Sequence, residues 1–99
     1  MANYQRFTAA TIAQVLARAE EVLTARLPLR KTAQTHHSIT LSGGDGTVTF
    51  TCHRHGLDTD VVASTDQLRT SRLDNDAQYL MTLLPDQPDD VMATREARP

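Results

Sequence analysis

The clearest pattern in the chain is a helical repeat of apolar positions in the stretch TAATIAQVLARAEEVLTARL, near the N-terminus. Apolar residues recur three and four positions apart, the spacing that places them on one face of a helix. Thr8 is the candidate N-cap, with Phe7 and Ile12 placed for a hydrophobic staple. The Leu27-Pro28 step ends the stretch, because the residue before a proline is disfavoured in helical geometry. We therefore expect one amphipathic helix here.

A connection over residues 28–35 is followed by strict alternation in HHSITLSGGDGTVTFTCHRHGLDTDVVAS. Apolar and β-branched residues alternate there with Ser and Thr, a period of two that is typical of strands. The Gly-Gly-Asp-Gly sequence inside the segment predicts a hairpin turn, because glycine adopts positive φ without steric cost. A loop at Gly44-Asp45 places Ile39 beside Phe50. A second loop at His55-Gly56 then places Phe50 beside Val61.

Both predicted hairpins put the same side chains on one apolar face. The shared set is Ile39, Leu41, Val48, Phe50, Cys52, Val61 and Ala63. A slip of one residue in either hairpin would turn half of this set toward water, so the alternation constrains which face is buried. The segment therefore predicts a three-stranded antiparallel meander with one apolar face.

A second helix is predicted in SRLDNDAQYLMTLLP, where apolar residues again recur at helical spacing. Ser71 is its candidate N-cap, with Asp74 in the place of a capping-box partner, and Pro85 ends it. The aspartates at 74 and 76 are expected on an exposed part of its first turns. Residues 86–99 are polar and contain several prolines, and we expect a mobile tail or a short helix there.

The expected fold is therefore α+β: an α-β-β-β-α two-layer sandwich with both helices on one face of a three-stranded meander. Residues 1–85 form its single domain. This element order resembles that of double-stranded RNA-binding domains, which grip phosphates with a basic start of the second helix. Here the same position reads SRLDNDAQ, with two aspartates and one arginine. We expect no nucleic-acid binding.

Charge is unevenly distributed along the 99 residues. Residues 1–56 contain six basic and three acidic residues, and residues 57–99 contain four basic and nine acidic residues. Such halves attract one another within a chain or between chains. The sequence has no apolar run long enough for a transmembrane helix, and its N-terminus lacks the apolar block of a secretory signal. With the single Cys52, this favours a cytoplasmic protein that does not act on membranes.

The polar face of the predicted meander carries a candidate metal site. In the predicted register His36 lies opposite His53, and His53 lies opposite Asp58, with His55 nearby at the turn. Directly opposed side chains on neighbouring strands lie about 5 Å apart at Cβ. Two imidazoles and a carboxylate form a ligand set that zinc or iron accepts. The alternative interpretation is a solvated polar face with no metal and no cofactor.

Cys52 beside His37 has the composition of a nucleophile and base. Cys52 belongs to the apolar series, however, and burial raises the pKa of a thiol and makes it inert. We expect Cys52 in the core and expect no enzyme activity from this pair.

Two functions remain open at this point. The first is a non-enzymatic protein-interaction module, self-associating as a homodimer or binding a protein partner through the open sheet face or an edge strand. The second is a metal-binding or metal-sensing protein that uses the His36, His53, Asp58 and His55 cluster.

Overall fold

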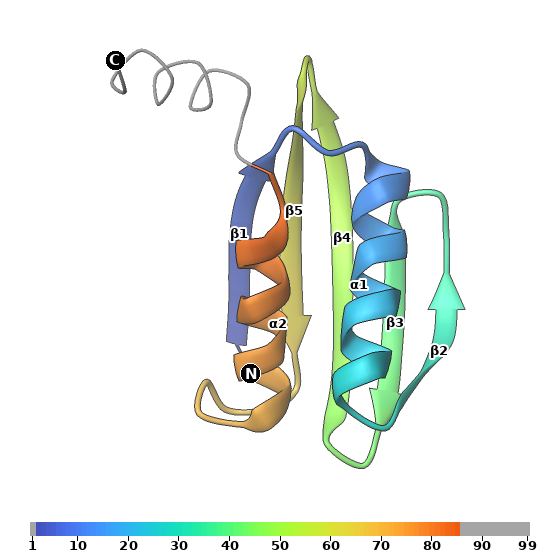
Figure 1. Cartoon of the computed structure of the whole chain (residues 1–99), viewed down its shortest axis with the longest axis vertical. Coiled ribbons are helices and arrows are strands. Elements are labelled where there is room, and N and C mark those ends of the chain that lie inside the picture. Colours follow the sequence, from blue (N-terminus) through green and yellow to red (C-terminus); the bar gives the residue numbers. More distant parts are fainter. Residues whose placement is uncertain (1, 86–99) are drawn as a thin grey trace.

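The computed structural model describes residues 2–85 of the chain. The elements are β1 (Ala2–Thr8), α1 (Ile12–Arg26), β2 (Leu29–Gln34), β3 (Ser38–Gly43), β4 (Gly46–His55), β5 (Asp58–Thr65) and α2 (Arg72–Leu83). The strands form one antiparallel sheet in the order β1-β5-β4-β3-β2. Both helices pack on the same face of this sheet (Figure 1). The prediction for residues 86–99 lies outside the described residues.

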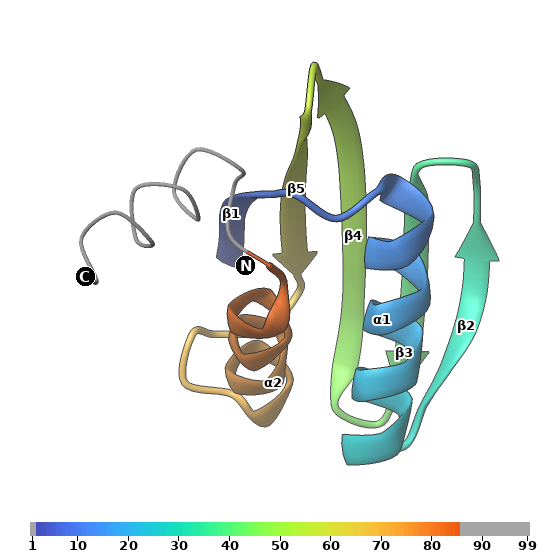
Figure 2. The ribbon, with the colours of Figure 1, turned by 45° about the horizontal axis from the view of Figure 1, so that its top comes forward.

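The α+β class is confirmed, but the three-stranded meander is too small. β3, β4 and β5 form the predicted meander, and one further strand pairs with each of its edges. The turned view of Figure 2 shows the whole sheet behind the two helices, which leaves its other face without a helix.

β1 was not predicted because its buried side is polar. Its inward positions are Ala2, Tyr4, Arg6 and Thr8, so the strand lacks the alternation of apolar residues that marks a half-buried strand. Arg6 donates from Nη2 to the carbonyl of Leu84 at 2.8 Å, and the Thr8 hydroxyl donates to the carbonyl of Pro85. The polar side chains of β1 thus satisfy carbonyls at the end of α2, which the sequence pattern of β1 alone does not reveal.

The predicted N-cap at Thr8 is wrong, because Thr8 is the last residue of β1. Helix α1 is capped by Thr11, whose hydroxyl accepts from the backbone N–H of Gln14 at 3.2 Å. The Gln14 side chain accepts in return from the backbone N–H of Thr11 at 2.8 Å, which completes a capping box. The predicted end of the helix is confirmed: Arg26 is its last residue and Leu27 its C-cap.

The predicted connection over residues 28–35 contains strand β2. Only Leu29 of this strand is buried, so no alternation of apolar residues announces it. β2 pairs with β3 from Leu29 to Gln34, with a bulge between Lys31 and Ala33. A bulge and charged residues are typical of an edge strand that resists further pairing.

The first predicted hairpin is confirmed, and the second is shifted by two residues. Ile39 pairs with Phe50 as expected, but Phe50 pairs with Ala63 instead of Val61. The observed two-residue loop is Gly56-Leu57, with Gly56 at a φ of 61°. A hairpin loop with glycine at its first position needs positive φ only there, whereas a His55-Gly56 loop would place the imidazole residue first. A shift of two residues preserves the faces, and the whole predicted apolar set is buried.

Helix α2 follows the prediction, with Ser71 as its N-cap. The side chains of Leu73, Ala77, Leu80 and Met81 pack against the sheet together with the buried face of α1. The expectation that Asp74 is exposed is wrong, since this residue is fully buried.

Candidate functional site

The open face of the sheet is the surface that no described helix covers (Figure 2). Its side chains form rows across the strands, which follow from the observed pairing. The three central rows are Phe7, Asp60 and His53; Gln5, Val62, Thr51 and Ser38; and Asn3, Ser64, Thr49, Thr40 and Ala33. The centre of this face is therefore formed by small hydroxyl residues around Val62.

Several polar groups of the open face already bond to one another. The Thr40 and Thr49 hydroxyls lie 3.0 Å apart, as do those of Ser42 and Thr47. At the β1 side, Gln5 Nε2 donates to Asp60 at 2.8 Å. A hydroxyl that keeps a hydrogen bond loses less on leaving water than one with no partner. Much of this face can therefore be covered at a moderate desolvation cost.

The histidines gather at one end of the open face, but not in the predicted row. His53 pairs with Asp60 and His55 pairs with Asp58, so the predicted neighbours His53 and Asp58 are not opposite one another. The shift in the second hairpin is the cause.

The imidazole that lies nearest to His53 also differs from the prediction. The ring of His37, not that of His36, contacts His53, with centroids 6.2 Å apart and an interplanar angle of 64°. His36 is exposed in the connection before β3. Within residues 2–85 no group of three His, Cys, Asp or Glu side chains is placed to hold a metal ion. The predicted ligand set of His36, His53, Asp58 and His55 is thus not brought together within one chain.

An aromatic contact marks the β1 corner of the same end. The rings of Phe7 and His55 meet edge to face, with centroids 6.3 Å apart. Phe7 is 41 % exposed, and Leu57 at the neighbouring hairpin tip is 75 % exposed. Both exposed apolar side chains lie toward the β4–β5 hairpin end of the sheet.

Cys52 lies on the opposite side of the sheet, in the core. It is fully buried, and its backbone N–H donates to the carbonyl of His37 at 2.8 Å. Burial raises the pKa of the Cys52 thiol to about 11, with a smaller contribution from the negative charge of Asp60. The thiol is therefore protonated at neutral pH, and the prediction that Cys52 is a core residue is confirmed.

A polar cluster around Asp74 was missed by the sequence analysis. Its carboxylate accepts from the hydroxyls of Tyr4 at 2.7 Å, Ser71 at 2.7 Å and Thr65 at 2.8 Å. Burial raises the pKa of Tyr4, and the hydrogen bond to Asp74 raises it further. The cluster joins β1, β5 and the start of α2. Its only sequence signal is the Ser71-x-x-Asp74 spacing, which predicts the cap and not the other two partners.

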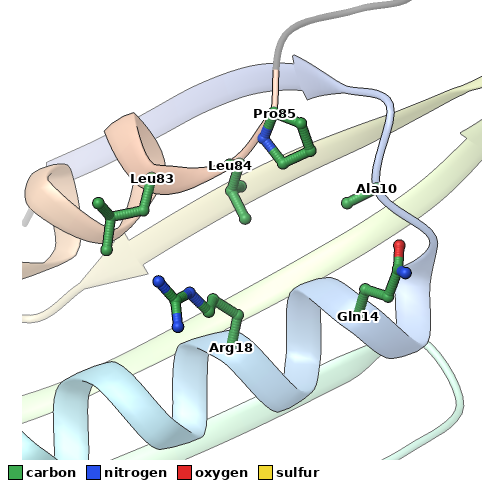
Figure 3. A pocket seen from close by; sticks show the side chains of 6 residues that line it. All are labelled: Ala10, Gln14, Arg18, Leu83, Leu84 and Pro85. Carbon is green, nitrogen blue, oxygen red and sulfur yellow. The ribbon is translucent and has the colours of Figure 1, made fainter.

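The two helices leave a hollow between them at the end where the described chain stops (Figure 3). It measures about 280 Å³ and is lined by Ala10, Gln14, Arg18, Leu83, Leu84 and Pro85. Gln14 and Arg18 lie on α1 on one side, and the end of α2 with the two residues that follow it lies on the other (Figure 3). Arg18 forms an ion pair with Glu21, with 2.7 Å between Nη1 and Oε1. A more open hollow of about 480 Å³ lies beside Arg26, which pairs with Asp76 at 3.0 Å.

Comparison of the chain with protein-family models, with curated proteins and with solved structures finds no match. Among the helices described in residues 2–85, neither has the length and apolar character needed to cross a bilayer.

Proposed function

We propose that this protein is an interaction module that self-associates as a two-fold symmetric dimer through the open face of its sheet. The observation that carries the proposal is the row Phe7, Asp60 and His53 on the open face, which the His37 ring extends by its contact with His53 from the bend before β3. If the same row of a second copy is laid over it in the opposite order, each side chain faces one with which it makes a favourable contact.

A two-fold axis that runs parallel to the strands between β4 and β5 reverses the row. It stacks β5 on β4 of the second copy, and β1 on β3. Asp60 then faces His53 of the second copy, and Phe7 faces His37 of the second copy. Each contact occurs twice, as a two-fold interface requires. Carboxylate with imidazole and phenyl with imidazole are both favourable pairs.

The centre of the face suits such stacking. Val62 meets Thr51 of the second copy, and Ser64 meets Thr49, so methyl groups and small hydroxyls fill the middle of the interface. The hydroxyl of Thr49 keeps its partner Thr40 within the same sheet. Stacked sheets lie about 10 Å apart, a spacing that short side chains fill without large voids.

Strand β2 lies outside the four overlapping strands. Its bulge and its charged residues Arg30 and Lys31 oppose further pairing at that edge, and the charges stay in water. The two-fold arrangement thus covers the strands with few charges and leaves the charged edge free.

The area over which the two sheets overlap indicates how tightly the dimer is expected to bind. Four strands spaced about 4.8 Å apart and some eight residues long, at about 3.3 Å each, give roughly 500 Å² of flat area per copy. Stable interfaces bury roughly 800 Å² of accessible surface per partner. The overlap falls below that value, in the size class of weak and transient interfaces, so the dimer is expected to be weak, with a Kd in the micromolar range.

The test is a single charge placed at the centre of the face. Val62→Lys puts an ammonium group against Thr51 of the second copy, and we expect it to weaken dimerisation about tenfold or more. Sedimentation velocity over a concentration series measures the Kd, and circular dichroism checks that the variant folds. The control is Ala17→Lys, which adds the same charge at an exposed position of α1 on the far side of the molecule.

Two results would contradict the proposal. The first is a wild-type chain that stays monomeric at high micromolar concentration. The second is a dimer that Ala17→Lys weakens as much as Val62→Lys does, because the interface would then include the helical side.

A further inference from the structure

His37 and His53 have the arrangement of two ligands of one metal ion. Both are exposed on the open face, and their rings lie 6.2 Å apart, centre to centre. Zinc binds imidazole nitrogen at about 2.0–2.1 Å, so two imidazoles on one tetrahedral zinc have ring centres about 5 Å apart. A small side-chain rotation closes the difference of about 1 Å.

The surroundings of His37 favour a metal-binding orientation. Its Nδ1 lies 3.1 Å from the hydroxyl of Thr35, which in turn lies 2.8 Å from the hydroxyl of Ser38. When Nδ1–H donates to Thr35, the ring orientation is fixed and Nε2 keeps the lone pair that a metal needs. Metal-binding histidines commonly have their second nitrogen held in this way.

One chain does not supply the third ligand. The carboxylate nearest in register to His53 is Asp60, which lies on the side of His53 away from His37. β3 and β5 are two strand spacings apart, which is about 10 Å, so His37 and Asp60 of the same chain do not meet on one ion. This agrees with the absence of a three-residue metal group within residues 2–85.

The proposed dimer supplies the third ligand from the second copy. Its two-fold axis places Asp60 of the second copy over His53, on the open side of the His37 and His53 pair. An imidazole, an ion and a carboxylate in line would span about 12 Å, and the bent angle of a tetrahedral site shortens this to the spacing of about 10 Å between stacked sheets. Two histidines, one carboxylate and a water are a ligand set of zinc sites.

Resting on the proposed dimer, we infer that His37 and His53 bind a zinc ion together with Asp60 of the second copy. The dimer then holds two ions, one for each chain. Each ion links the two sheets, so zinc binding and dimerisation strengthen one another by linkage.

The experiment titrates zinc chloride into the full, tag-free chain, before and after treatment with EDTA. Calorimetry gives the stoichiometry, and sedimentation equilibrium gives the dimer Kd. We expect one zinc ion per chain and a dimer Kd lowered about tenfold or more by zinc. His37→Ala and His53→Ala are expected to abolish both effects. Asp60→Asn is expected to weaken zinc binding about tenfold and to reduce its effect on the dimer.

The other two histidines are the matched controls. His36 and His55 lie at the same end of the molecule, and their change to alanine is expected to leave zinc affinity within about twofold of the wild-type value. A loss of binding in either variant as large as that in His53→Ala overturns the assignment, as does the absence of zinc binding by a chain that dimerises. That last result leaves the proposed dimer standing.

Zinc binding without dimerisation would contradict the proposed dimer. If zinc binds to His37 and His53 of a chain that stays monomeric, both Asp60 of the second copy as a ligand and the proposed face-to-face dimer are overturned. The Val62→Lys variant gives a further check, because it is expected to bind zinc about tenfold more weakly although it retains all three ligand residues.

Discussion

At the scale of single residues, the strongest polar constraint in the core is the Asp74 carboxylate. It is fully buried and accepts hydrogen bonds from the hydroxyls of Tyr4, Thr65 and Ser71. These donors come from β1, from β5 and from the turn before α2. One side chain thus fixes the position of the start of α2 relative to two strands. A satisfied buried network of this kind favours a single arrangement of the elements it joins.

Replacement of Asp74 measures this constraint. Asp74→Ala leaves three hydroxyls without their acceptor, and we expect a loss of about 3 kcal/mol in the free energy of unfolding. Asp76→Ala is the matched control two residues along the same helix. It removes the ion pair with Arg26, whose side chain is 46 % exposed, and is expected to cost less than about 1 kcal/mol. Urea unfolding of both variants compares them, and equal losses would contradict the role given to Asp74.

Residue-level prediction from the sequence succeeded for the apolar face and failed for the histidines. The seven residues of the predicted apolar set are all buried, because any register with the correct parity buries them. To predict a metal site, the exact pairing of residues on neighbouring strands must be known. The observed pairing differs by two residues, so Asp60 and not Asp58 lies opposite His53. The contact of His37 with His53 depends on the bend of the chain before β3, which no alternation pattern describes.

At the scale of elements, the β4–β5 hairpin is defined by the conformation of one glycine. Gly56 has a φ of 61°, in the left-handed region that other residues rarely adopt, while a Cβ built there meets no atom within 4 Å. Gly56→Ala is therefore a test of backbone conformation without a steric clash, and we expect it to cost about 1 kcal/mol.

Gly44 in the β3–β4 hairpin provides the control. A Cβ there also meets nothing, and its φ lies outside the left-handed region. Gly44→Ala is expected to be neutral or to stabilise the fold by about 0.5 kcal/mol, through the lower entropy of the unfolded chain. The two variants are compared by thermal or urea unfolding. A neutral Gly56→Ala would show that Gly56 does not occupy the first position of the loop.

Strands β1 and β2 show why the edges of the sheet could not be predicted. Sequence periodicity detects a strand through the apolar side chains that it buries. β2 buries Leu29 alone, and β1 directs Tyr4 and Arg6 toward polar groups of α2. Both strands are held by backbone pairing to a neighbour and by these tertiary contacts. The meander and both helices bury apolar stripes, and those are the elements that the sequence predicted.

At the scale of the whole molecule, the main feature is that both helices cover one face of the sheet and no described helix covers the other. A one-sided antiparallel sheet is stable in water, so folding alone does not require a cover. In the proposed dimer, Asp60 and His53, which pair across β5 and β4, occupy positions that the two-fold axis exchanges. This symmetry predicts that exchanging the two residue types leaves the interface complementary.

A charge-exchange experiment tests that prediction in the presence of EDTA, so that zinc does not contribute. His53→Asp places two aspartates of one copy against two of the other, and the repulsion is expected to raise the dimer Kd about tenfold or more. Adding Asp60→His to this variant recreates every carboxylate–imidazole pair with the partners reversed, and we expect a Kd within about threefold of the wild-type value. Sedimentation equilibrium measures all three chains. A folded double variant that stays monomeric would mean that these residues do not face one another across a two-fold axis, since that symmetry makes the exchange neutral.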